Sequence, residues 1–135
     1  MTSKLFEPIT MRGVTLPNRI VLSPMCQYSA WEGNATDWHM MHLGGYALSG
    51  LGLAITEAAA VEPRGRITQD CVGLYSDDNE EALLQVVAFC HRHGGAPMGI
   101  QLPHAGRKAS SYRPGEGRGP RPAGDRAWQT VAAST

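Results

Sequence analysis

Long apolar runs are missing from this sequence of 135 residues. None approaches the roughly 20 residues that a membrane-spanning helix needs, and the first segment, MTSKLFEPIT, lacks the apolar stretch of a signal peptide. Cysteine is scarce, since Cys26, Cys71 and Cys90 are an odd number without metal-site spacing. This scarcity argues against a disulfide framework and for a reducing compartment. We therefore expect a cytoplasmic protein without a membrane partner.

A net charge is also missing, because 12 Lys and Arg residues balance 12 Asp and Glu residues. Nothing in this balance points to a nucleic-acid or membrane-surface partner. The charge is nevertheless uneven, since residues 106–126 hold six basic and only two acidic side chains. Two interpretations are open for this basic stretch: a solvated loop, or a loop that meets an anionic cofactor or another chain.

Several short apolar segments have the length of β-strands. Two of them flank Arg12-Gly13 within residues 5–16 and predict a β-hairpin. Three continuous apolar runs, by contrast, are typical of parallel strands that are buried on both faces. These runs are residues 19–23, 51–61 and 97–102.

Two helices are expected between these strands. The first covers residues 36–49, where apolar residues recur at four-residue spacing. Gly44 and Gly45 weaken such a helix, so we expect close packing against a neighbour to compensate. The second begins with Asp77 in a capping-box pattern and ends at Gly94.

The order of hairpin, strand, helix, strand, helix and strand predicts an α/β fold with a parallel sheet and right-handed crossovers. Three strands are too few to close a barrel, and residues 105–135 follow as a long loop without periodicity. We therefore expect that part of the domain lies outside this sequence. Because ligands of such folds gather at the carboxyl ends of the strands, the segments SPMCQY, EAAAV and IQLPHAGRK are expected to meet at one edge.

Four motifs together resemble the N-terminal third of the Old Yellow Enzyme family: LFEPITMRGVTLPNRIVLSPMCQYSA, DWHMMHL, EAAAV followed by PRGRIT, and GIQLPHAGRKAS. The cysteine after SPM is similar to that of the thermophilic-like branch, of the NADPH dehydrogenase type. The resemblance implies that residues 1–135 are the N-terminal part of one FMN-binding TIM (β/α)8 barrel: its hairpin, strands one to three and helices one and two. Since a whole barrel needs about 250 residues, it also implies a second chain carrying the rest of the barrel, in an oligomeric enzyme.

The function that the resemblance implies is that of an ene-reductase. NADPH or NADH would reduce FMN, and the flavin would pass hydride to an alkene activated by a carbonyl or nitro group. Two alternatives stay open: a non-catalytic remnant or binding module of the same barrel, and a metal-dependent barrel hydrolase. The second would need a metal, but His39 and His42 share a helical face without a third ligand evident in the sequence. We expect no metal site, and we prefer a supporting role for these histidines behind the Cys26 loop.

The resemblance also assigns roles to individual residues. Tyr28 would hydrogen-bond the substrate, and Cys26 would lie near the flavin ring and influence substrate binding, so both are the expected catalytic and substrate-binding residues. Gln101 would pair with the pyrimidine edge of the flavin, because an amide both donates and accepts. The expected cofactor-binding residues are Ser23, Pro24, Met25, Cys26, Ala58 and Gln101.

Simpler alternatives exist for these positions. Cys26, like Cys71 and Cys90, is a small hydrophobic residue suited to a core, and Ala58 is suited to plain packing. Glu57 is expected to be buried and to need hydrogen-bond donors, without a catalytic role. The HAGRK motif supplies candidate cations beside the flavin, or alternatively structural ion-pair partners: His104, Arg107 and Lys108.

Overall fold

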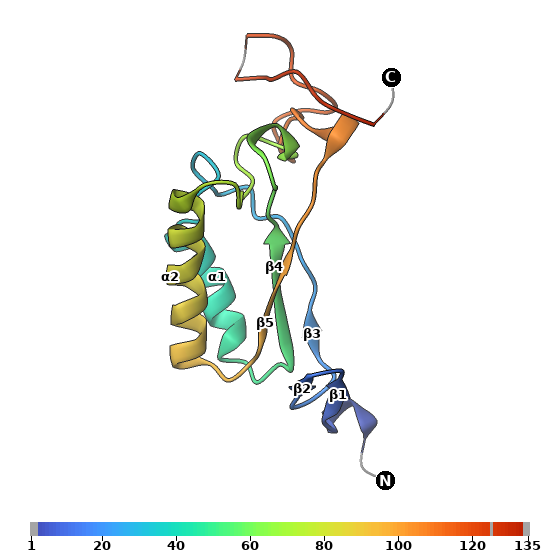
Figure 1. Ribbon diagram of the computed structural model, residues 1–135, viewed down its shortest axis with the longest axis vertical. Coiled ribbons are helices and arrows are strands. Elements are labelled where there is room, and N and C mark those ends of the chain that lie inside the picture. Colours follow the sequence, from blue (N-terminus) through green and yellow to red (C-terminus); the bar gives the residue numbers. More distant parts are fainter. Residues whose placement is uncertain (1–2, 125, 134–135) are drawn as a thin grey trace.

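The computed structural model describes residues 3–124 and 126–133 (Figure 1). Its first strands, β1 (Ile9–Met11) and β2 (Val14–Leu16), form an antiparallel pair that turns at Arg12-Gly13. The hairpin is therefore where the sequence predicts it. Asp125 and the last two residues of the predicted 105–135 loop lie outside the described residues.

A parallel sheet of three strands follows, in the order β3 (Val21–Leu22), β4 (Leu53–Ala58) and β5 (Met98–Gln101). The strands agree with the predicted positions but are shorter than the apolar runs. The run at 51–61 extends past its strand because Leu51 and the alanines after β4 are also buried. The apolar run is thus longer than the strand, because buried residues on either side of the strand are apolar as well.

Two helices, α1 (Asp37–Ala47) and α2 (Asp77–His93), lie side by side against one face of this sheet (Figure 1). The residue that caps α2 is Ser76, not Asp77, because Ser76 Oγ accepts the Asn79 N–H at 3.3 Å. The main core fills the space between helices and sheet. It consists of Leu22, Leu43, Ala47, Leu51, Ala54, Val86, Cys90 and Ala96.

The glycine pair of α1 differs in its surroundings. A Cβ atom on Gly44 would lie 2.6 Å from the ring of Phe89 on α2, whereas a Cβ on Gly45 would meet nothing within 4 Å. Gly44 therefore permits close contact between the helices, as expected from the sequence. Gly45 has no such role.

Different segments of the chain lie at the two ends of the sheet. Figure 1 shows the hairpin near the end where the strands begin, and the C-terminal stretch at the end where β4 and β5 finish. That stretch contains a 3-10 turn, Gly106–Lys108, and is tied back to the loop after β4 by the Trp128 Nε1–H, which donates to the Arg64 carbonyl at 2.9 Å. Within the described residues, no helix combines the length and apolarity required to cross a bilayer.

Among the residues that the structure describes, helices pack against only one face of this sheet. Apolar side chains on β3, on β5 and beside them remain more than a third exposed. These side chains are Ile20, Val21, Met25, Ile100 and Leu102, and we call them the open apolar row.

Candidate functional site

The carboxyl ends of the three parallel strands bring three of the predicted residues together. Ala58 at the end of β4 is the register partner of Gln101 at the end of β5. The backbone of Ala58 also hydrogen-bonds the sulfur of Cys26, which follows β3. The Ala59 N–H then donates to the Gln101 carbonyl at 2.9 Å. Cys26, Ala58 and Gln101 thus lie side by side at one edge of the sheet.

The segment after β3 differs from residue to residue in exposure. Ser23 and Met25 are exposed, whereas Pro24, Cys26 and Tyr28 are half-buried. Ala58 is buried and Gln101 is exposed. The edge therefore offers both accessible side chains and accessible backbone.

Tyr28 stands in a left-handed backbone conformation, with φ of 52°. Such a conformation costs a non-glycine residue about 1–2 kcal/mol, so it persists only where the surroundings hold it. Local contacts on either side contribute, since Gln27 Nε2 donates to the Met25 carbonyl at 2.9 Å and Ser29 Oγ to the Gln27 carbonyl at 3.0 Å.

Glu57 is the extra residue of an irregular strand pair. Thr56 pairs with Ile100 and Ala58 pairs with Gln101, so two steps along β4 correspond to one step along β5. An extra residue of this kind leaves the regular ladder and re-aims its side chain. Glu57 is only 5% exposed in this position.

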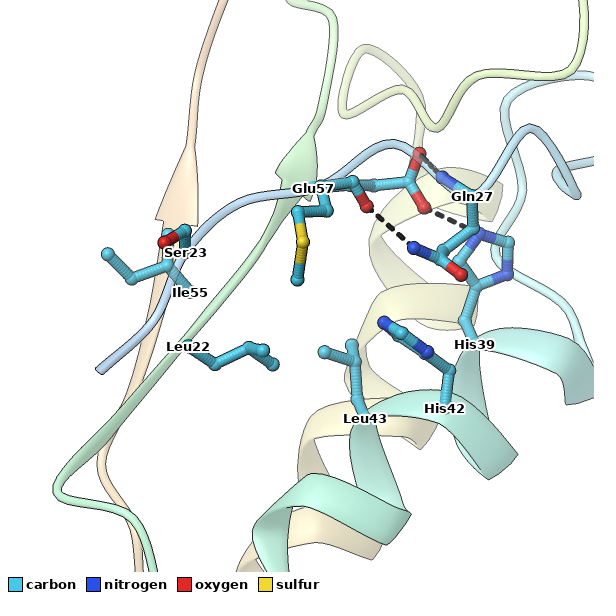
Figure 2. Close-up of a pocket in the computed structure, with 9 residues that line it drawn as sticks. Leu22, Ser23, Gln27, His39, His42, Leu43, Ile55 and Glu57 are labelled. Carbon is cyan, nitrogen blue, oxygen red and sulfur yellow. Dashed lines mark hydrogen bonds and ion pairs between the residues drawn. The ribbon is translucent and has the colours of Figure 1, made fainter. Parts of the chain in front are cut away.

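Both carboxylate oxygens of Glu57 have neighbours, as Figure 2 shows. Oε2 accepts the N–H of Gln27 at 3.2 Å, and Oε1 lies 3.0 Å from Nε2 of His39 on α1. The expectation that Glu57 is buried and finds donors is therefore confirmed.

The histidine of this pair is fixed at its other nitrogen. His39 is 2% exposed, and its Nδ1 accepts the backbone N–H of Thr36 at 2.9 Å. Because a backbone N–H only donates, Nδ1 carries no proton and the proton of the neutral ring is on Nε2, facing Glu57. The ring is not aligned for a hydrogen bond to Oε1, so the 3.0 Å contact is electrostatic.

His42 lies one helical turn beyond His39. Burial lowers its pKa, which favours the neutral ring. Both histidines line a small cavity of about 10 Å³ between α1 and the sheet (Figure 2). In the part of the chain that the structure describes, no three His, Cys, Asp or Glu side chains gather as a metal site.

Cys26 has a partner that the sequence did not reveal. Its thiol hydrogen-bonds Cys71, on a segment joined to the Cys26 loop by the Ala30 N–H, which donates to the Asp70 carbonyl at 3.0 Å. Cys71 is buried, and its sulfur also lies 3.4 Å from both the N–H and the hydroxyl of Thr68. No signal in the sequence distinguishes Cys71 from an ordinary core cysteine, and neither Cys26 nor Cys71 forms a disulfide in the structure.

These contacts set the protonation of the site. The hydrogen bond to Cys71, together with burial, raises the pKa of Cys26, and the same bond lowers the pKa of Cys71. Burial, followed by the charges of Cys26, Cys71 and Glu57, raises the pKa of Tyr28. At neutral pH the site therefore presents a neutral thiol at Cys26, whose single S–H is directed to Cys71, and a neutral phenol at Tyr28 that is able to donate a hydrogen bond.

The HAGRK loop lies after β5. His104 Nε2 is 2.7 Å from Glu62 Oε1, and this contact is the main reason why the pKa of Glu62 is lowered. Arg107 and Lys108 stand in the 3-10 turn with exposed side chains. His104 therefore has a structural partner in Glu62.

The sequence of this chain matches known flavin proteins. The model of the NADH:flavin oxidoreductase / NADH oxidase family matches residues 4–133. A NADH:flavin oxidoreductase of Gibberella zeae is 53% identical over 113 residues, covering 84% of this chain and 27% of that protein. The NADPH dehydrogenase of Bacillus subtilis is 48% identical over 111 residues, covering 81% and 32%.

The structure is similar to that of an Old Yellow Enzyme from Pichia sp. AKU4542, with a TM-score of 0.73 and 29% identity over 79% of this chain and 28% of that one. The predicted fold, the N-terminal portion of a TIM (β/α)8 barrel, is thereby confirmed. The chain spans about a third of the length of the curated relatives that it matches. From its matched motifs, its strand order and these likenesses, this chain belongs to the NADH:flavin oxidoreductase / NADH oxidase family.

Proposed function

We propose that this chain forms the N-terminal wall of an FMN site in an ene-reductase that uses NADPH or NADH to reduce activated C=C bonds, such as those of α,β-unsaturated carbonyl or nitro compounds. The observation that carries the proposal is the juxtaposition of Cys26, Ala58 and Gln101 at the carboxyl edge of a parallel sheet. In barrels of this class, that edge is where catalytic sites lie.

The residues at this edge fit the chemistry of a flavin ring. The ring needs an apolar surface and, at its pyrimidine edge, a group that both donates and accepts. The Gln101 side chain is exposed, and its amide forms no hydrogen bond with the described residues. Met25, which follows β3, offers exposed apolar surface. Bound FMN would supply hydride-transfer chemistry, and the protein would supply its position and electrostatics.

The chain's own residues would orient the substrate. The Tyr28 phenol, kept protonated by its raised pKa, would donate a hydrogen bond to the carbonyl or nitro oxygen that activates the alkene. The neutral Cys26 thiol would contact the ring through its soft, polarizable sulfur, because its S–H is directed to Cys71. Tyr28 would act as a donor without losing its proton at neutral pH.

The rest of the barrel is proposed to lie on a second chain that covers Ile20, Val21, Ile100 and Leu102 of the open apolar row. Several exposed apolar side chains on one sheet favour an interface. Mass spectrometry under denaturing conditions of the protein purified from its native source tests this part. Two separate polypeptides are expected, and one continuous longer chain would overturn the two-chain arrangement while leaving the flavin site in place.

The flavin site itself is tested by the FMN content of the complete protein. The protein is expected to hold one FMN for each copy of this chain, and Gln101→Ala is expected to weaken FMN retention by roughly tenfold, because a hydrogen bond is worth about 1 kcal/mol or more. Gln85→Ala is the matched control, since Gln85 is exposed on α2 and bonds only Glu81 there. Flavin-free complete protein would remove the catalytic proposal and favour a binding module.

The reaction is tested with a small cyclic enone under anaerobic conditions. Oxidation of NADPH should depend on the enone, and Tyr28→Phe should raise the KM for the enone because the donated hydrogen bond is lost. Cys26→Ala should change the flavin potential and the affinity for the enone. If both variants keep wild-type values, the roles proposed for Tyr28 and Cys26 are wrong.

A further inference from the structure

The turn that carries Cys26 and Tyr28 is held from outside on both sides of Tyr28. On one side, the Gln27 N–H donates to Glu57 Oε2 at 3.2 Å. On the other, the Ser29 carbonyl accepts a hydrogen bond from Thr36 Oγ1 at 3.0 Å. Glu57 belongs to β4 and Thr36 to the start of α1. Two elements that are distant in sequence therefore hold the residues on either side of Tyr28, which has a left-handed backbone.

His39 contacts both Thr36 and Glu57. Its Nδ1 accepts the Thr36 N–H at 2.9 Å, and its Nε2 lies 3.0 Å from Glu57 Oε1. The contacts therefore run without a gap from Ser29 through Thr36, His39 and Glu57 to Gln27. Both His39 and Glu57 are at least nine-tenths buried.

We propose that the buried His39–Glu57 pair is the positioning unit of the flavin-facing turn, setting the placement of Cys26 and Tyr28 without touching the flavin or the substrate. This inference rests on the proposed function, because it assumes that the turn faces FMN. A buried carboxylate is costly unless it is paired, and here both of its contacts lead to the turn that it would position.

The chemistry of the pair requires a carboxylate. Glu57 Oε2 accepts the Gln27 N–H, while Oε1 makes an electrostatic contact with Nε2 of His39. A glutamine at this position has only one accepting oxygen. Whichever way its amide is turned, an NH₂ group faces either the Gln27 N–H or the His39 ring N–H, so one of the two contacts is lost.

The role of the pair in positioning can be separated from a role in capping α1. In His39→Asn, the side-chain oxygen stands near the place of Nδ1 and can still accept the Thr36 N–H, but the shorter side chain does not reach Glu57. Glu57→Gln leaves the helix start untouched. His91→Asn and Glu81→Gln are matched controls, because both residues are exposed on α2.

The test compares these four variants in the complete protein. The first readout is amide hydrogen exchange of the peptide containing Gln27 to Ser29, which needs no flavin. The second is the midpoint potential of the bound FMN, and the third is the split between kcat and KM. We expect His39→Asn and Glu57→Gln to speed exchange of this peptide several-fold, because each variant removes one of the contacts that hold Glu57 against the turn.

With FMN still bound, the same two variants should shift the potential and lower kcat by up to roughly a hundredfold, the effect of a small misplacement of catalytic groups. Wild-type exchange, potential and kcat in both variants would overturn the proposal. So would faster exchange with an unchanged potential and kcat, which would make the pair merely structural. If His39→Asn does not fold, Glu57→Gln decides alone. If the complete wild-type protein is found to contain no FMN, the proposed function is refuted. The exchange comparison still decides in that case whether the His39–Glu57 pair holds the turn.

Discussion

The backbone N–H of Gln27 donates to the carboxylate of Glu57 at 3.2 Å, across a separation of 30 residues in the chain. Gln27 stands between Cys26 and Tyr28, and Glu57 precedes Ala58 on β4. One bond therefore ties together SPMCQY and EAAAV, two of the three segments that the strand order predicts to meet at a single edge. It also explains how a buried carboxylate with no catalytic assignment can matter for the site.

Removing that carboxylate should destabilise the protein. Glu57→Ala leaves the Gln27 N–H without its acceptor and the His39 ring N–H without its carboxylate neighbour, and leaving a buried polar group unsatisfied in this way costs about 1–3 kcal/mol. Urea unfolding of the complete protein measures the loss. Glu81→Ala, at an exposed position on α2, should change stability by no more than about 0.5 kcal/mol. Equal effects of the two substitutions would contradict the buried pair.

The two adjacent glycines of α1 should respond in opposite directions to alanine. Gly44→Ala places a Cβ 2.6 Å from the ring of Phe89, and such overpacking costs about 1–3 kcal/mol. Gly45→Ala meets nothing within 4 Å and should stabilise the helix by up to about 1 kcal/mol. Thermal unfolding of both variants gives the comparison, and a Gly44→Ala protein as stable as Gly45→Ala would show that the helices are not in close contact there.

Removing Cys71 should make Cys26 more reactive. The hydrogen bond with Cys71 is the largest cause of the raised pKa of Cys26. Without it the pKa falls, more thiolate is present at a given pH, and alkylation by iodoacetamide accelerates about tenfold for each unit of the fall. Peptide mass spectrometry after alkylation at several pH values follows Cys26 alone. Cys90→Ala serves as the control, and an unchanged Cys26 profile in Cys71→Ala would refute the contact.

Stability that depends on His104 should disappear in acid. The bond from His104 is the main cause of the lowered pKa of Glu62, so this contact stabilises the fold while Glu62 is ionised. Its contribution is lost as the pH falls through that lowered pKa. The difference in urea stability between wild type and His104→Ala should therefore shrink as the pH falls below the ordinary pKa of a glutamate and through the lowered pKa of Glu62. Arg64→Ala should show a smaller difference, because its effect on Glu62 is secondary.

Much of this fold can be predicted from local patterns in the sequence. Apolar spacing and glycine positions located the hairpin, both helices and all three strands, because each element depends on residues close together in the chain. The parallel order of the strands then placed Cys26, Ala58 and Gln101 at one edge, since consecutive crossovers align the carboxyl ends. Even the burial of Glu57 followed from its place in a continuous apolar run.

Contacts between distant segments were decided only in three dimensions. The partnership of Cys26 with Cys71 arises where the loop after β4 folds back beside the Cys26 turn, joined to it by the Ala30–Asp70 hydrogen bond. The direction of the Glu57 side chain depends on a shift in strand register. No residue type in the sequence predicts that shift.

The sequence by itself thus determined which elements form, which family motifs are present and which edge of the sheet they share. Only the tertiary structure decided that Glu57 meets His39 and Gln27, that Cys71 meets Cys26, and that Gly44 rather than Gly45 meets Phe89. The physical reason is the distance along the chain over which each effect acts. Backbone preferences and apolar periodicity act over a few residues, whereas a buried polar contact exists only after packing has brought distant segments within about 3 Å.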